Sequence, residues 1–281
     1  MPKINKSTIT IGFLPDDDRN GENPSAPRHF SVHDAEKRHG IRFPFTLAAP
    51  SFVLRAGVAE NARILSKLVP EIGLLFFEGE ACLAYTETDL PPDMAELNVS
   101  WHVHLPLDLP WHQGMDAVWS VLARLMDKVA YLGPRAWVLH PPVEPGQLTA
   151  LAERLRVRGV ASADILLENV EESDLCACWD EARAAGFSTC LDLGHILAYG
   201  QQDVLALPGL AETVRMAHIY GPEGSRHRSL ALLDEAGRHL LRHILETFSP
   251  GTVVVEIFNE AEFFESIELL AKWLARWETP E

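Results

Sequence analysis

Short apolar runs separated by amphipathic stretches repeat along the chain from residue 43 onward. Each run is continuously apolar and often rich in β-branched residues, which is typical of a strand buried on both faces. Eight such runs are present: FPFTLA (43–48), IGLLFFE (72–78), VSWHVH (99–104), AWVLH (136–140), DILLE (164–168), STCLD (188–192), VRMAH (214–218) and TVVVEIF (252–258). The pattern therefore predicts eight buried strands.

The segments between these runs have the periodicity and the end signals of helices. Gly133–Pro134 ends one segment, and Ser173 and Gly186 are expected to cap another. The predicted helices cover residues 61–68, 116–133, 145–159, 173–186, 230–247 and 260–277. Strands that alternate with helices predict an α/β fold, a (β/α)8 TIM barrel. A doubly wound sheet is the alternative, but no Gly-rich phosphate loop follows the first strand.

The two ends of the pattern suggest a domain division. Residues 1–40 are polar, with DDD at 16–18 and NGENPSAP at 20–27, and we expect them to form an N-terminal extension. Residues 41–281 are expected to form the barrel domain.

Composition favours a globular protein of the cytoplasm. The 281 residues are 47% hydrophobic and 23% charged. No apolar stretch reaches the roughly 18 residues of a membrane-spanning helix, and the N-terminus turns acidic before a signal-peptide core could form. The four cysteines form no CxxC pair, so a reducing compartment is expected and no membrane partner is predicted. The sequence leaves the oligomeric state open.

Charge argues against nucleic acid as a partner. The chain carries 24 Lys plus Arg against 40 Asp plus Glu, a net charge of −16. Proteins that bind phosphate backbones are usually basic, at least locally, because that attraction supplies most of the affinity.

Seven of the eight predicted strands carry an ionisable residue at or near their end. These residues are Glu78, His104, His140, Glu168, Asp192, His218 and Glu256, and His195 and His227 lie just beyond strand ends. In a TIM barrel such positions meet at one rim. Burying carboxylates and imidazoles together is costly unless something satisfies them, and divalent cations bind both. The pattern predicts a metal site.

Each of these residues alone has an ordinary structural explanation. A histidine at a strand end is more often hydrogen-bonded structure, a glutamate more often a rim ion pair, and Asp192 alone could cap the next turn. The prediction rests on their number at one rim. His102 points to the same side as His104 but lies deeper, so we expect it to be a packed, hydrogen-bonded residue.

The motifs HVHLP, VLHP, LLEN, CLDLGH, AHIYG, RHRSL and VVVE together resemble the xylose-isomerase-like barrel superfamily. They are most similar to the branch that contains the family 2 apurinic endonucleases. The resemblance covers about residues 43–275 and implies two or three divalent ions, Zn²⁺ or Mn²⁺. It implies metal ligands at His104, His140, Glu168, Asp192, His195, His218, His227 and Glu256. Glu168 would bridge two ions, with Glu168, Asp192, His195 and Glu256 as catalytic residues. Ser225 stands where those endonucleases place an aspartate that helps hold a third metal, so the metal count stays open.

Three activities fit this resemblance. Single-metal sugar epimerases resemble the chain only at Glu168, Asp192, His218 and Glu256, and His104, His140 and His227 have no role in their chemistry. Two-metal phosphodiester hydrolysis uses these extra ligands, so we favour it over epimerisation. An abasic-site endonuclease is a further alternative, and so is a binder without turnover.

A narrower resemblance names a substrate. FTLAAPSFVL (45–54), NARILSKLVPEIGLLFFE (61–78) and WHVHLPLDL (101–109) are similar to the cobamide-remodelling phosphodiesterases. This implies hydrolysis of the nucleotide-loop phosphodiester of adenosylcobalamin-like corrinoids. Substrate contacts are expected from Glu78, Asp108, Tyr220, Arg226 and Arg228. Trp111, Phe77, Tyr85 and Tyr220 are candidates for the apolar walls that a corrin ring needs, although each could simply cover the barrel.

Overall fold

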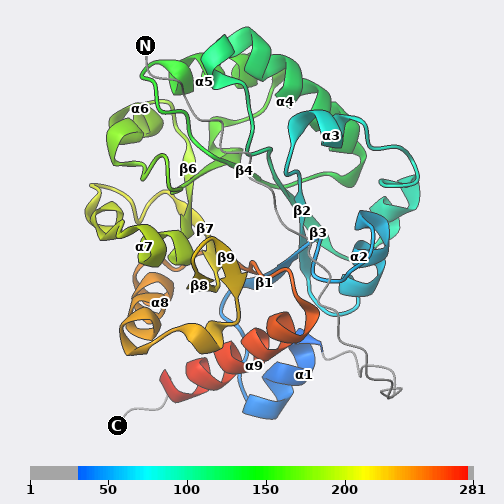
Figure 1. Ribbon diagram of the computed structural model, residues 1–281, viewed down its shortest axis with the longest axis vertical. Coiled ribbons are helices and arrows are strands. Elements are labelled where there is room, and N and C mark those ends of the chain that lie inside the picture. Colours follow the sequence, from blue (N-terminus) through cyan, green and yellow to red (C-terminus); the bar gives the residue numbers. More distant parts are fainter. Residues whose placement is uncertain (1–30, 278–281) are drawn as a thin grey trace.

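A computed structural model describes residues 31–277 of the chain, and the part of the predicted extension before residue 31 lies outside the described residues. Eight parallel strands close into a barrel in the order β1-β10-β7-β6-β5-β4-β3-β2 (Figure 1). The strands are β1 (Thr46–Pro50), β2 (Glu71–Leu75), β3 (Ser100–His104), β4 (Trp137–Leu139), β5 (Ile165–Glu168), β6 (Ser188–Asp192), β7 (Val214–Ile219) and β10 (Thr252–Val255). The predicted (β/α)8 barrel is confirmed, and each strand lies within or overlaps its predicted run.

Helices surround the barrel (Figure 1). The α-helices are α1 (Val32–His39), α2 (Val58–Leu65), α3 (Gly79–Leu83), α4 (Met115–Val129), α5 (Gln147–Arg158), α6 (Trp179–Ala184), α7 (Leu193–Tyr199), α8 (Glu235–Phe248) and α9 (Glu260–Trp277). Short 3-10 turns lie at Pro92–Glu96, Trp111–Gln113, Ala130–Leu132, Ser162–Asp164, Cys176–Cys178, Gln202–Ala206 and Leu230–Leu232. A two-stranded hairpin, β8 (Gly221–Glu223) with β9 (Arg226–Arg228), follows β7. Among residues 31–277 no helix is both long and apolar enough to cross a membrane.

Helix α1 belongs to the segment predicted as a polar extension, yet it packs against α9, and the two lie side by side at the lower edge of Figure 1. Ser31 and Asp34 form a capping box at its start, which satisfies free backbone N–H groups. His39 Nε2 lies 2.9 Å from Glu268 Oε1 on α9. Residues 31–40 are therefore docked on the barrel.

The helix predicted at residues 173–186 begins later than expected. Ser173 does not cap it; its backbone pairs with Val170 instead. Leu175 has a φ of 67°, a left-handed conformation that L-residues avoid in helices, and α6 starts only at Trp179. The predicted cap at Ser173 is wrong because the chain makes a local turn there first.

The barrel interior holds a small apolar layer separate from the main core between strands and helices. It consists of Ala48, Val138, Leu166, Cys190, Met216 and Val254, one from each of six strands. Below it lies a polar floor, in which His102 Nδ1 is 2.7 Å from Glu71 Oε1. Both side chains are buried, so the prediction that His102 is a packed, hydrogen-bonded residue is confirmed.

Candidate metal centre

The strand period places the predicted ligands one layer above the apolar interior. Because side chains two apart along a strand share a face, the residues that follow the apolar layer by two positions point into the barrel at its carboxyl end. Val138 is followed in this way by His140, Leu166 by Glu168, Cys190 by Asp192, Met216 by His218 and Val254 by Glu256. His104 likewise follows His102 on β3. The six predicted ligands on these strands therefore form a ring at the carboxyl end of the barrel.

Glu168 lies at the centre of this ring and is almost fully buried. Its Oε2 is 3.0 Å from His104 Nε2 and 3.2 Å from His140 Nε2. Its Oε1 is 2.9 Å from His218 Nδ1. The two oxygens of one carboxylate therefore face two different groups of ligands.

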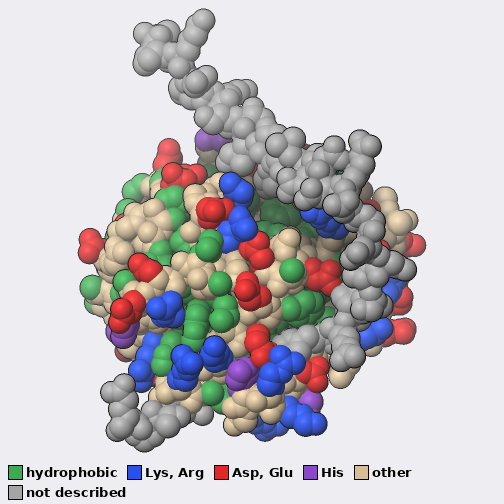
Figure 2. Space-filling view, turned by 60° about the horizontal axis from the view of Figure 1, so that its bottom comes forward, with side chains coloured by type: hydrophobic (Ala, Val, Ile, Leu, Met, Phe, Trp, Pro, Cys, Tyr) green, Lys and Arg blue, Asp and Glu red, His purple; other side chains and the backbone are tan. Residues whose placement is uncertain are grey.

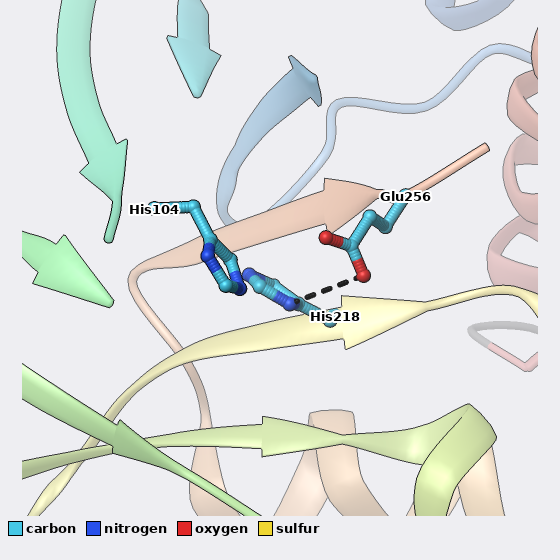
Figure 3. A group of neighbouring side chains, drawn as sticks. All are labelled: His104, His218 and Glu256. Carbon is cyan, nitrogen blue, oxygen red and sulfur yellow. Dashed lines mark ion pairs between the residues drawn. The ribbon is translucent and has the colours of Figure 1, made fainter. Parts of the chain in front are cut away.

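The second group lies on β6, β7 and β10. His218 Nδ1 is 3.4 Å from Glu256 Oε2 and 3.9 Å from Asp192 Oδ2. Figure 3 shows the side chains of His104, His218 and Glu256 pointing toward one another from their strands. Four sets among the described residues have ligand atoms within 4.8 Å of one another: His104 with His218 and Glu256, Glu168 with Cys190 and His218, His104 with His140 and Glu168, and Glu168 with Asp192, His218 and Glu256. The last two sets together hold the six ring residues. The structure brings all six together.

Buried polar atoms without partners show that the site suits cations. Asp192 Oδ2 and His218 Nε2 are buried and have no hydrogen-bond partner. Such atoms are costly unless a ligand satisfies them. His104 Nδ1 donates to the carbonyl oxygen of Leu105 at 2.9 Å, so in the neutral ring Nε2 presents a lone pair to the Glu168 carboxylate. His104 Nε2 and Glu168 would therefore both serve as ligands of a cation, which would remove the conflict between the two acceptors.

His195 and His227 lie at the edge of the ring. His195 Nδ1 donates to the carbonyl oxygen of Asn169 at 2.8 Å, and His227 Nδ1 donates to that of Glu256 at 2.9 Å. A histidine held through Nδ1 by a backbone oxygen presents Nε2 as a ligand atom. His227 Nδ1 is also 3.3 Å from Glu256 Oε2. Their assignment as metal ligands stays a prediction.

The charges of the ring shift its pKa values in opposite directions. Burial opposes ionisation of Glu168 and Glu256, but the charge of His218 leads the effects that outweigh burial, and the pKa of both carboxyl groups lies well below the usual range. Burial, reinforced by the charges of Glu168 and Glu256, raises the pKa of Asp192 to about 6. Burial disfavours the imidazolium of His218, yet the negative charges of Glu256 and Glu168 raise its pKa well above the ordinary value. Burial raises the pKa of Cys190 to about 12, so it stays a thiol.

Of the residues predicted to contact substrate, Asp108, Arg226 and Arg228 already contact other protein groups, whereas Glu78 is exposed. Asp108 Oδ1 accepts from the backbone N–H of Gly79 at 2.8 Å and so ties the turn after β3 to α3. Arg228 pairs with Glu262 and Glu223, and Arg226 lies 3.7 Å from Glu223. Glu78 is exposed at the start of α3. Substrate contact by these residues stays a prediction.

Tyr220 is buried rather than exposed to a ligand. Its ring stacks on His227 with centroids 3.7 Å apart. On another side it meets Gly194, where an added Cβ would lie 2.1 Å from the ring. Tyr220 therefore positions His227, and a direct substrate contact is left as a prediction.

Asn169 is a residue of the site that the sequence did not single out. Its Oδ1 accepts from the backbone N–H of Asp192 at 2.8 Å, and its Nδ2 donates to the Asp192 carbonyl oxygen and to Gln201 Oε1. Its own carbonyl oxygen holds His195. Its place directly after Glu168 in the LLEN motif was the available signal.

A closed (β/α)8 barrel with buried histidines and carboxylates at its carboxyl rim defines the class of protein: a TIM barrel with a candidate metal centre. No protein-family model matches the chain, and no curated protein matches it. Solved structures do.

A D-tagatose 3-epimerase-like protein is 17% identical, with a TM-score of 0.62 over 82% of this chain and 97% of that one. Endonuclease IV from Thermus thermophilus is 20% identical, with a TM-score of 0.61 over 82% and 99%. Another Thermus thermophilus protein, soaked with ZnCl2, is 22% identical, with a TM-score of 0.52 over 85% and 100%. At these identities the likeness shows a shared fold.

Proposed function

We propose that this protein is a metal-dependent enzyme that binds two divalent ions and hydrolyses a phosphodiester. The observation that carries the proposal is the position of Glu168, whose two oxygens face His104 and His140 on one side and His218 on the other. A carboxylate placed in this way suits two neighbouring ions. Paired sites of this kind are typical of enzymes that cleave phosphoesters.

The six ring residues divide into two sets of candidate ligands, one for each proposed ion. His104, His140 and Glu168 Oε2 would hold one ion, and Asp192, His218, Glu256 and Glu168 Oε1 the other. When bound, such ions lower the pKa of water and neutralise phosphate charge. Asp192 and Glu256 would orient the attacking water, and His195 and His227 offer Nε2 atoms at the edge of the centre.

The nucleotide-loop phosphodiester of a cobamide is our proposed substrate, and it rests on the sequence resemblance described above. The net charge of −16 is compatible with a substrate that carries one phosphodiester. Acidic side chains are spread over the face seen in Figure 2, and basic ones gather toward its lower edge. An abasic-site endonuclease would have to bind DNA with an affinity that falls as salt rises, and the net negative charge of this protein argues against such binding.

A single-metal sugar epimerase is the second candidate. Glu168, Asp192, His218 and Glu256 form a complete buried set on their own. Solved structures with this fold include a D-tagatose 3-epimerase-like protein, a D-allulose 3-epimerase and a D-psicose 3-epimerase. In this alternative Glu168 and Glu256 would transfer a proton between the two faces of a sugar carbon, and His104 and His140 would have no catalytic role.

One set of measurements separates the two candidates. The purified protein is analysed for metals and then incubated with adenosylcobalamin, with bis(4-nitrophenyl) phosphate, and with D-fructose or D-tagatose. We expect about two ions per chain, phosphodiester cleavage, and a loss of at least about a hundredfold in rate for His140→Ala. His239→Ala, an exposed histidine on α8, is the matched control and should behave as wild type.

The outcomes assign the function. Epimerised sugar, together with one ion and a fully active His140→Ala variant, would overturn hydrolysis in favour of epimerisation. If the protein cleaves the nitrophenyl ester but leaves adenosylcobalamin intact, the proposed hydrolase activity stands and the cobamide is excluded as its substrate.

A further inference from the structure

Aromatic side chains form a continuous row along one side of the rim. The ring centroids of Phe52 and Phe77 are 5.3 Å apart, and those of Phe77 and Phe258 are 6.0 Å apart. Phe258 continues to His227 at 5.2 Å, and Tyr220 stacks beneath His227 at 3.7 Å. We call Phe52, Phe77 and Phe258 the phenylalanine row.

The row occupies the part of the rim that supplies few of the candidate metal ligands. Phe52, Phe77 and Phe258 follow β1, β2 and β10, and β1 is hydrogen-bonded to both of the other strands. The ligand sets described above contain no residue of β1 or β2. The row nevertheless reaches the centre, because Phe258 contacts His227, whose Nδ1 lies 3.3 Å from Glu256 Oε2.

The surface of the row is apolar and partly open to solvent. Phe258 is 37% exposed, and Phe52 and Phe77 are partly exposed. Three phenyl rings offer no hydrogen-bonding group, whereas a sugar needs partners for its hydroxyl groups. Exposed apolar surface beside a polar centre is typical of a ligand site.

We propose that the phenylalanine row binds a flat aromatic or conjugated ring that the substrate carries next to its phosphodiester. The inference rests on the proposed hydrolysis and adds a specificity determinant to it. Aromatic faces pack well against other flat rings, in offset or edge-to-face arrangements. The net charge of −16 favours a small substrate with one phosphodiester over a polynucleotide.

The test separates ring binding from catalysis. Phenyl methylphosphonate and methyl methylphosphonate carry the same single negative charge and differ only in the ring. Their dissociation constants are measured by calorimetry on the protein as purified. Phe258→Leu and Phe77→Leu remove a ring but keep an apolar side chain. Phe43→Leu is the matched control, because Phe43 is also partly buried beside another phenylalanine but precedes β1, at the opposite end of the barrel.

We expect wild type and Phe43→Leu to bind the phenyl ester at least about tenfold more tightly than the methyl ester. Phe258→Leu and Phe77→Leu should reduce this preference to about threefold or less and leave the affinity for the methyl ester unchanged. Equal affinity of wild type for the two esters, no measurable binding of either, or a preference retained in both variants overturns the proposal. So does equally tight binding of glucosyl methylphosphonate, which would assign the row to a sugar ring.

Hydrolysis is scored separately with bis(4-nitrophenyl) phosphate and methyl 4-nitrophenyl phosphate. If both esters are cleaved at equal kcat/KM and binding shows no preference for a ring, the proposed role of the phenylalanine row is refuted, whereas the proposed hydrolysis stands. If the protein prefers esters that carry a ring but cleaves no diester, adenosylcobalamin included, the proposed hydrolysis is refuted. The phenylalanine row then remains a ring-binding surface.

Discussion

Asp192 has three tasks at one position. It ends β6, its Oδ1 accepts from the backbone N–H of His195 at 2.6 Å to cap α7, and its Oδ2 is buried in the candidate metal centre without a hydrogen-bond partner. The sequence suggested both the capping and the ligand role. The hydrogen bond from the backbone N–H of Asp192 to Asn169 Oδ1 could not be predicted from the sequence, because the ends of β5 and β6 become neighbours only in the folded barrel.

The raised pKa values of Asp192 and His218 give a pH dependence to metal binding. A metal must displace the proton from His218, whose pKa lies well above the ordinary value of 6.5, and below about pH 6 also the proton from Asp192, whose pKa is about 6. The affinity for Zn²⁺ should therefore fall as pH decreases, and more steeply below about pH 6. The expected fall is about tenfold per pH unit for one displaced proton. Calorimetric titration of the metal-depleted protein between pH 5 and 7.5 measures it. A constant affinity over that range would contradict this role for Asp192.

Glu71 makes a second prediction, about stability. Burial opposes its ionisation, but the hydrogen bond and charge of His102, together with hydrogen bonds from Ser100 and Thr252, outweigh burial and lower the pKa of Glu71 below its ordinary value of 4.5. Because the folded-state pKa is depressed, this stabilisation is present above about pH 4.5 and is lost as pH falls through the folded value. Glu71→Gln should cost about 1–3 kcal/mol of unfolding free energy at pH 7 and progressively less below pH 4.

Urea unfolding at several pH values measures this cost. Glu235→Gln, on the exposed surface of α8, is the control and should change stability by less than about 0.5 kcal/mol at any pH. A Glu71→Gln variant as stable as wild type at pH 7 would show that the polar floor contributes nothing.

At the scale of elements, strands were predictable and short connecting elements were not. Continuous apolar runs are a strong signal for barrel strands, and their ends locate the ligands. Helix α7, seven residues long, and the β8–β9 hairpin are too short to show a period. The hairpin did carry a turn signal, Gly224–Ser225, and Gly224 adopts a φ of 61°. Of the phenylalanine row, the sequence named only Phe77 as a candidate pocket wall; its contacts with Phe52 and Phe258 could not be predicted, because the three residues come from separate strand ends.

Gly194 on helix α7 meets Tyr220, the residue directly before the hairpin, which leads to a further prediction. A Cβ on Gly194 would overlap the Tyr220 ring, which in turn supports His227. Gly194→Ala should therefore displace His227 and lower activity at least about tenfold. It should also lower the unfolding free energy by about 1–3 kcal/mol. Gly57→Ala is the control, since a Cβ there meets nothing within 4 Å. Unaltered activity of Gly194→Ala would show that His227 need not be held.

At the scale of the whole molecule, the buried charges of the centre link metal to stability. Ligands that bind only the folded state stabilise it by mass action, about 2.7 kcal/mol at a hundred times Kd. Removing metal with a chelator should lower the unfolding temperature of wild type by several degrees, and restoring Zn²⁺ or Mn²⁺ should reverse the change. Glu168→Gln should show a much smaller response. Equal melting of chelated and metal-restored wild type would contradict a metal centre.

The order of the candidate ligands along the chain has a consequence for when the candidate metal centre can form. The candidate ligands extend from His104 on the third strand to Glu256, which directly follows the strand that closes the barrel against β1. A nascent chain on the ribosome therefore lacks both barrel closure and the last carboxylate until β10 and Glu256 have been synthesised. The full set of candidate ligands can therefore bind cations only after the last barrel strand has been made and has paired with β1.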